Sequence, residues 1–194
     1  MPSIKSPTPI LPTAEDAEPT PLQGLAPIIS AETKLIVLGS FPGVASLVAQ
    51  QYYGHPRNQF WPILSALWGL EGKEALQRRP YEERIAEARA RGLGIWDVYA
   101  SCLREGSLDS AIEQPELNAL HRLLEWAPSL QAIAHNGGES ARHMKVTQTL
   151  GLPVIKLPST SPANASWSFD RKLTAWRDAF AQFGLCTASD HSAR

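Results

Sequence analysis

Cysteine is scarce in this sequence, and its scarcity excludes several kinds of site. The 194 residues include two cysteines, Cys102 and Cys186. They lie far apart, so they provide neither a disulfide framework nor the four thiolates of an iron–sulfur or zinc site. The five histidines show no metal-ligand spacing. We therefore expect no metal, and no motif indicates an organic cofactor.

Long apolar runs are missing as well. No stretch approaches the roughly 20 apolar residues that span a bilayer. The N-terminus also lacks the basic-then-apolar pattern of a secretory signal. These absences predict a cytoplasmic protein without a membrane partner.

The chain has no large excess of either charge. Its formal net charge is −1, whereas nucleic-acid-binding domains are often basic overall. A protein that binds DNA briefly needs only a local basic face. The charge balance is thus a mild argument against a nucleic-acid partner and does not exclude one.

Proline is concentrated at the N-terminus. The prolines of this segment are Pro2, Pro7, Pro9, Pro12, Pro19 and Pro21. They interrupt every possible helix, and few apolar residues accompany them, so residues 1–23 are predicted to be a disordered tail. Residues 24–186 are long enough for one domain with a sizeable core. Residues 187–194 are predicted to be a second, C-terminal tail.

Apolar strand-like runs alternate with helical patterns in the rest of the chain. The predicted strands are 34–38, 93–99, 130–134 and 153–157, and the predicted helices are 58–70, 73–91, 115–126, 138–150 and 169–180. Short apolar strands separated by helices indicate an α/β fold with a mostly parallel sheet. We expect a three-layer α/β/α architecture around a central four-stranded sheet.

Small or polar residues follow each predicted strand. These segments are 39–43, 99–101, 135–138 and 158–162. In open parallel sheets, ligands bind at the carboxyl ends of the strands. All four segments are therefore expected to meet at one edge of the sheet.

The densest of these signals combines a glycine-containing loop with two tyrosines and a helix start. Gly39 lets the backbone approach a ligand closely, and Tyr53 can stack on a flat ring. The amide of Asn58 can hold a water molecule or the edge of a base. The alternative is that the tyrosines belong to the core and that the loop is only a tight turn.

Together, these segments resemble a known family. Gly39-Ser-Phe-Pro-Gly43 and Tyr52-Tyr-Gly-His-Pro-Arg-Asn-Gln-Phe-Trp61 are similar to two motifs of the uracil-DNA glycosylase superfamily, and most similar to its hypoxanthine-type, or DNA-deoxyinosine, glycosylases. The resemblance covers about residues 34–182. It implies an enzyme that flips a deaminated base out of DNA and hydrolyses the N-glycosidic bond, acting in base excision repair as a monomer.

A second family motif matches Leu157-Pro-Ser-Thr-Ser-Pro162. In the superfamily this loop presses on the DNA backbone beside the flipped nucleotide. The resemblance thus implies that Ser159, Thr160 and Ser161 contact DNA. The alternative is a rigid Ser/Pro turn. The residue that would wedge into the gap is not fixed by the sequence.

Two residues depart from the family pattern. At the position of Phe41, many members carry Asp or Asn, which orients the attacking water. At the position of Leu157, some members carry His. The hypoxanthine-type members share this lack, and in them the asparagine at the helix start is implicated in catalysis. That role is carried over to Asn58, whose alternative role is to cap the helix.

The remaining candidates concern recognition of the base and the DNA. The resemblance places Asp97 in the base-recognition region, where its carboxylate would accept the N1–H of hypoxanthine, and Gly39, Ser40, Phe41 and Tyr53 are expected to surround the base. The alternative role for Asp97 is to cap a turn. His135 and Asn136 precede a helix start that is predicted to bind phosphate or the base edge, the alternative being that His135 is a satisfied turn histidine.

Several readings of function stay open at this point. The favoured one is a monofunctional DNA glycosylase that releases hypoxanthine, uracil or another deaminated purine such as xanthine. A hydrolase of free nucleosides would act on inosine without DNA. A non-catalytic damage binder would bind such sites and leave them uncleaved. A Ser/His/Asp hydrolase is poorly supported, because Ser40 lies in no Gly-x-Ser-x-Gly elbow.

Overall fold

The computed structural model describes residues 20–186 of the chain. The predicted C-terminal tail and most of the predicted N-terminal tail, residues 1–19, lie outside these residues. The predicted tail boundary at residue 23 is two residues late, because Leu22–Gln23 form strand β1 and pair with strand β4 (Tyr99–Leu103).

The central sheet has four strands in the order β3 (Leu93–Asp97), β2 (Leu35–Gly39), β6 (Ala132–Asn136) and β7 (Val154–Leu157). All three ladders are parallel. Every residue of β2 is buried, as expected for a central strand covered on both faces. The predicted four-stranded parallel sheet is confirmed. The ladder places Gly39 directly opposite Asp97 at its carboxyl end.

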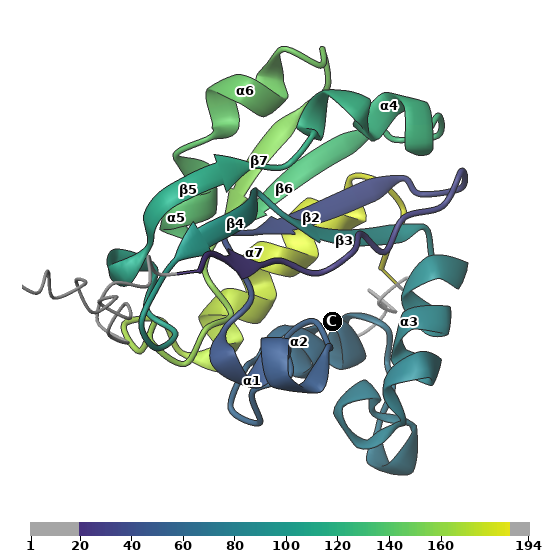
Figure 1. The fold of residues 1–194 in the computed structure, drawn as a ribbon. Helices are drawn as coiled ribbons and strands as arrows, with labels where there is room; N and C mark the ends of the chain where they lie inside the picture. Colours follow the sequence, from purple (N-terminus) through teal and green to yellow (C-terminus); the bar gives the residue numbers. More distant parts are fainter. Residues whose placement is uncertain (1–19, 187–194) are drawn as a thin grey trace, which may run out of the picture.

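Helices cover both faces of this sheet (Figure 1). Helices α2 (Phe60–Leu67) and α7 (Phe169–Ala181) pack together on one face, and α3 (Tyr81–Ala90) packs along β3. Helices α4 (Leu123–Trp126) and α6 (Met144–Gln148) lie over the other face. Two short helices, α1 (Val44–Ala49) and α5 (Gly138–Ala141), follow the ends of β2 and β6. The predicted α/β/α layers are thus present.

A second sheet was not predicted. It is antiparallel, with the strand order β1, β4 and β5 (Glu113–Leu117). The predicted strand 93–99 is therefore wrong at its end, because the chain leaves the central sheet after Asp97 and enters the second sheet at Tyr99. The predicted helix 115–126 is wrong in its first half, where Pro115 fits an exposed edge strand instead.

Three predicted helices are shorter than expected. Only Tyr81–Ala90 of the segment 73–91 is α-helical, because Pro80 cannot continue a preceding helix. The segment 138–150 is divided into α5 and α6, and the segment 58–70 forms a helix only at α2. Short 3-10 helices occupy Gly72–Glu74, Leu76–Arg78, Asp109–Ala111 and Leu120–Arg122.

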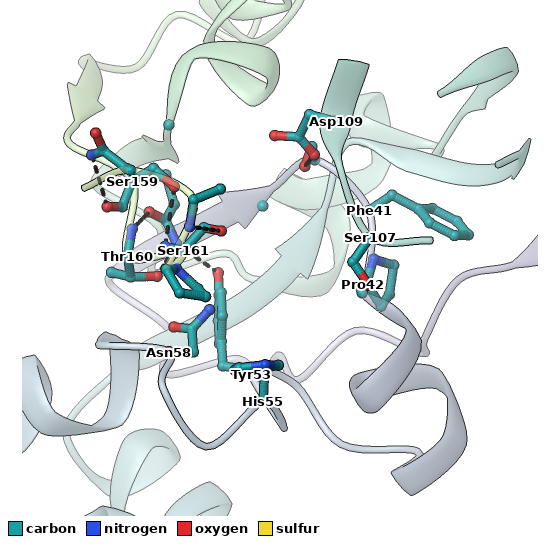
Figure 2. A pocket seen from close by; sticks show the side chains of 18 of the residues that line it. Phe41, Pro42, Tyr53, His55, Asn58, Ser107, Asp109, Ser159, Thr160 and Ser161 are labelled. Atoms are coloured by element: carbon teal, nitrogen blue, oxygen red, sulfur yellow. Dashed lines mark hydrogen bonds between the residues drawn. The ribbon is translucent and has the colours of Figure 1, made fainter. Parts of the chain in front are cut away.

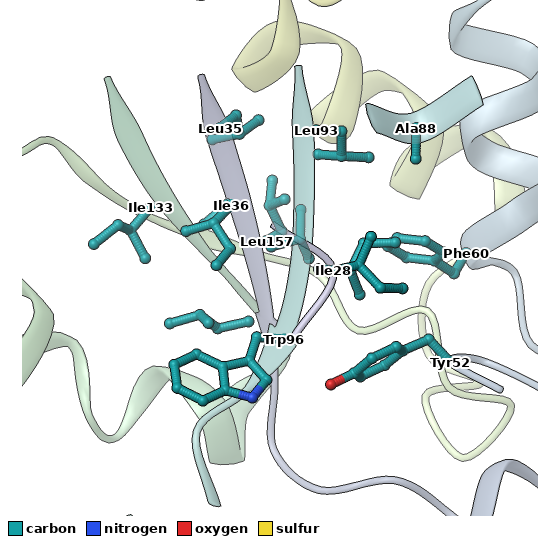
Figure 3. Close-up of a cluster of buried hydrophobic side chains, with 14 of the residues drawn as sticks. Ile28, Leu35, Ile36, Tyr52, Phe60, Ala88, Leu93, Trp96, Ile133 and Leu157 are labelled. Carbon is teal, nitrogen blue, oxygen red and sulfur yellow. The ribbon is translucent and has the colours of Figure 1, made fainter. Parts of the chain in front are cut away.

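The core lies between the central sheet and its helices. Leu35 and Leu93, which are paired in the sheet, and Phe60 of α2 all belong to this core (Figure 3), and each of these side chains is fully buried. Burial of this apolar surface is the main stabilising contribution to the fold. The packed core therefore holds the ends of the central strands in fixed positions. No helix among residues 20–186 is long and apolar enough to cross a bilayer.

Candidate active site

A pocket of about 760 Å³ opens at the carboxyl edge of the central sheet. Its walls include the segments 39–43, 136–138 and 156–164 together with Asp97, so all four strands of the sheet contribute to it. Among the predicted loops, only 99–101 is absent from the lining, because these residues belong to β4. Figure 2 shows Asn58 and Tyr53 on one side of the pocket and Asp109 on the other.

Asn58 lies at the start of the α2 region and lines the pocket. Its Oδ1 accepts the backbone N–H of Phe60 at 3.0 Å. Its Nδ2 has no hydrogen-bond partner within residues 20–186. The side chain thus caps the first N–H of α2 from the position before the N-cap residue Gln59, and its two amide protons are left for a water molecule or a substrate.

Tyr53 adopts an unusual backbone conformation that directs its ring into the pocket wall. Its φ is 55°, in the left-handed region that non-glycine residues seldom occupy. One face of the ring stacks on Phe60, with centroids 3.7 Å apart. Its hydroxyl accepts a hydrogen bond from Nδ2 of Asn136 at 3.2 Å. Tyr53 is thus held on one face and at its tip.

The loop after β2 forms the wall beside the second sheet. Ser40 donates a hydrogen bond to Oδ1 of Asp109 at 2.6 Å. Phe41 is buried, and the guanidinium of Arg104 lies 5.0 Å from its ring centroid. Phe41 therefore lines the pocket with one face of its ring covered by an arginine.

Asp97 lies in the lining of the pocket and is 4% exposed. Neither of its carboxyl oxygens accepts a hydrogen bond from the described residues, and Oδ2 is fully covered. Burial, and after it the negative charge of Asp109, raise the pKa of Asp97 to about 7 against the opposing effect of Arg104. The Asp97 side chain does not cap a turn, which was the alternative role. The hydrogen bond from Asn118 goes to the backbone carbonyl oxygen of Asp97.

The loop after β7 is held by buried hydrogen bonds. Asn136 donates from Nδ2 to Oγ1 of Thr160 at 3.0 Å, and its Oδ1 accepts the backbone N–H of Thr160 at 3.0 Å. The predicted DNA contact through the side chain of Thr160 is wrong in this structure, because that side chain is fully buried. Asn136 was also predicted to bind DNA, but its side chain forms hydrogen bonds with both Thr160 and Tyr53. Ser159 and Ser161 remain partly exposed at the pocket.

The predicted DNA contact through His135 is also wrong for its side chain. His135 is fully buried and hydrogen-bonds Ser140 at 2.8 Å and Thr147 at 2.9 Å. Desolvation lowers its pKa to about 4. The ring points away from the pocket, toward α5 and α6, so the alternative of a satisfied structural histidine holds.

The connection between β4 and β5 contributes residues that the sequence did not reveal. Ser107 and Asp109 of this connection line the pocket, and Arg104 packs against Phe41 of the loop after β2. Ser107 accepts the backbone N–H of Val44 at 2.9 Å, and Arg104 donates to the carbonyl oxygen of Pro42. No local pattern indicates these residues, because the second sheet that positions them was not predicted.

Lys172 of α7 holds in place the pocket wall formed by the loop after β7 and the start of α2, called the far wall below. The side chain is 2% exposed, and its Nζ donates to Oε1 of Gln59 at 2.8 Å and to the carbonyl oxygen of Asn164 at 3.0 Å. Trp176 of the same helix donates to the carbonyl oxygen of Pro158 at 3.1 Å. Helix α7 thereby ties the loop after β7 to the start of α2.

The Lys172→Met variant should be less stable than wild type. Methionine preserves most of the buried volume and removes both hydrogen bonds, so the free energy of unfolding should fall by roughly 1.5–3 kcal/mol. Urea unfolding measures the change. The matched variant Lys145→Met alters an exposed lysine and should stay within about 0.5 kcal/mol of wild type. Equal stability of the two variants would contradict the fastening role of Lys172.

No group of three or more acidic, histidine or cysteine side chains within residues 20–186 could hold a metal ion. What the pocket does provide is a stacking ring, a free amide and an unpartnered carboxyl group. These are suited to binding a planar heterocycle and a water molecule.

Comparisons with known proteins show what the chain is similar to. Residues 26–180 match the model of the uracil DNA glycosylase superfamily. The chain is 35% identical to a hypoxanthine DNA glycosylase of Methanosarcina barkeri and 34% identical to one of Methanosarcina acetivorans, in each case over 81% of this chain and 97% of the relative. A solution NMR structure of a Methanosarcina acetivorans protein proposed to be a uracil DNA glycosylase has a TM-score of 0.75 and 32% identity, covering 84% of this chain and 99% of that one. The chain therefore belongs to the uracil DNA glycosylase superfamily.

Proposed function

We propose that the protein is a monofunctional DNA glycosylase that releases hypoxanthine, and to a lesser extent uracil, from DNA. The observation that carries this proposal is the free amide of Asn58 in the lining of the pocket at the strand ends. Membership of the superfamily and the two hypoxanthine DNA glycosylase relatives support the same reaction.

Each pocket residue has its own role in the proposed reaction. The target nucleotide must leave the helix, because the duplex hides its glycosidic bond, and a mispaired base lowers the energy required. The free face of Tyr53 then stacks on the extruded base, beside Gly39, Ser40 and Phe41. Asp97 binds the base edge at the pocket floor. Asn58 holds the water that attacks the anomeric carbon, and the products are a free base and an abasic site.

The DNA backbone lies along the mouth of the pocket in this proposal. Ser159 and Ser161 are placed to donate to phosphate, since both are partly exposed there. Asn136 and Thr160 act indirectly, because their hydrogen bonds fix the shape of that loop. We also propose that the protein acts as a monomer, as a single chain supplies the entire pocket.

A strand-cleavage assay tests the function. Labelled duplexes with a single inosine or uracil are incubated with the protein and then treated with alkali, which breaks the strand at an abasic site. We expect cleavage at inosine, with slower cleavage at uracil. Hydrolysis of free inosine with no action on DNA would indicate a nucleoside hydrolase instead, and binding of the damaged duplex without cleavage would indicate a damage binder.

A further inference from the structure

The Asp97 carboxyl group is a buried acid without a partner. It is 4% exposed, lies in the pocket lining, and receives no hydrogen bond from any residue between 20 and 186. A Cβ atom built on Gly39 would lie 2.2 Å from its Oδ1, so the opposite strand leaves room for this carboxyl group only because glycine stands there. An ionised carboxylate in such a place is strongly disfavoured.

The surroundings of Asp97 do not supply a paired cation. The titratable or charged groups that interact with it are Tyr52 and Tyr53 before α2, Tyr81 of α3, and Arg104 and Asp109 of the β4–β5 connection. Arg104 donates to the carbonyl oxygen of Pro42 and covers Phe41, and it forms no ion pair with Asp97. Asp109 adds a second negative charge to the pocket wall. With its pKa raised to about 7, the Asp97 carboxyl group is neutral in roughly half of the molecules at pH 7.

We propose that Asp97 enters the reaction as a neutral carboxylic acid and donates its proton to the departing base. The inference rests on the proposed glycosylase function. The C1′–N bond breaks with its electron pair going to the base, and the Asp97 proton moves to a nitrogen or oxygen atom of that base, which leaves as a neutral molecule. Water held by Asn58 adds to C1′ and releases a proton, which returns Asp97 to its neutral form.

A proton donor at the base lowers the barrier to breaking the glycosidic bond. Negative charge develops on the base as the bond breaks, and a positioned acid typically contributes about 100- to 10,000-fold to such a step. His135 cannot serve, because it is buried away from the pocket. Leu157, at the end of β7, is apolar. Asp97 is the carboxyl group buried in the pocket wall and left without a partner.

The dependence of the base-release rate on pH tests the proposal. Single-turnover release of hypoxanthine from an inosine duplex is measured from about pH 5 to about pH 9, bracketing the Asp97 pKa of about 7. The wild-type rate constant should fall as pH rises through this pKa, because the acid is lost. Asp97→Asn should be roughly 100-fold slower and should lack this fall.

Asp109→Asn tests how the surroundings of Asp97 set its ionisation. Removal of the neighbouring negative charge makes ionisation of Asp97 easier, so the fall in rate should begin at lower pH than in wild type, whatever the maximal rate of this pocket variant. Binding of Asp97→Asn to a duplex with a hydrolysis-resistant 2′-fluoro inosine analogue should stay within about threefold of wild type, because the asparagine amide can still hydrogen-bond the base edge. A carboxyl group that only recognised the base would change this binding and leave the shape of the pH profile unchanged.

The possible failures are distinguishable. A wild-type protein that releases no base from any duplex would contradict the glycosylase function itself, and the donor role with it. Release by wild type that Asp97→Asn matches in rate and pH profile would overturn the donor role alone. A wild-type rate that rises with pH through the same range would also overturn it, because Asp97 would then act in its ionised form.

Discussion

Replacing Asn58 by alanine is expected to lower the rate constant for base release by roughly 100- to 1000-fold. The amide Nδ2 faces the pocket without a partner among the described residues, and Phe41 and Leu157 offer no group that could position water in its place. Single-turnover release of hypoxanthine from an inosine duplex measures the loss. Duplex binding should change little, because the amide acts on the attacking water.

The capping role of Asn58 requires its own control. Alanine also removes the hydrogen bond from Phe60 N–H to Oδ1, and such caps contribute about 1 kcal/mol to stability. Asn58→Ser retains a capping oxygen and lacks the amide, so it should unfold like wild type and release base as slowly as the alanine variant. Near wild-type activity of the serine variant would show that Asn58 serves the helix and not the reaction.

A methyl group at Gly39 should disable the pocket as well. The Cβ atom of alanine would lie 2.2 Å from Oδ1 of Asp97 and 3.5 Å from the hydroxyl of Tyr53, so the buried carboxyl group must move. A displacement of about 1 Å in an active site lowers rates by roughly 100-fold, and overpacking of this kind lowers the free energy of unfolding by about 1–3 kcal/mol. Base release and urea unfolding are the two measurements.

Two variants isolate the contact between Gly39 and Asp97. Gly138→Ala adds a methyl group in the same pocket where no other atom lies within 4 Å, so its activity and stability should stay close to wild type. The double variant Gly39→Ala/Asp97→Ala relieves the clash, so it should regain stability without regaining activity. A Gly39→Ala protein with wild-type activity would contradict the close fit.

The central sheet was predictable because its strands are continuous apolar runs. All residues of Leu35–Gly39 and Ala132–Asn136 are buried, and such runs in alternation with helices are typical of parallel sheets. The second sheet was not predictable in the same way. Strand Glu113–Leu117 is exposed along its whole length and is defined by its pairing with Tyr99–Leu103, which no local pattern encodes.

The candidate site, like the fold, was predictable only in part. Asn58, Tyr53 and Asp97 meet in one pocket, as predicted, because their segments precede or follow strands of a single sheet. His135 was assigned to DNA because it precedes a helix start, and Thr160 because it lies in a family motif, yet buried hydrogen bonds draw each side chain into the interior. Position at the end of a strand therefore predicts which loop lines the pocket and does not predict the direction of each side chain.

The dependence of the pocket on α7 bears on the order in which the protein is made. Lys172 and Trp176, which fasten the loop after β7, belong to the last helix of the described residues. A ribosome has delivered Asn58, Tyr53 and Asp97 well before this helix emerges. A nascent chain therefore carries these reactive groups before α7 can hold the loop after β7 in place.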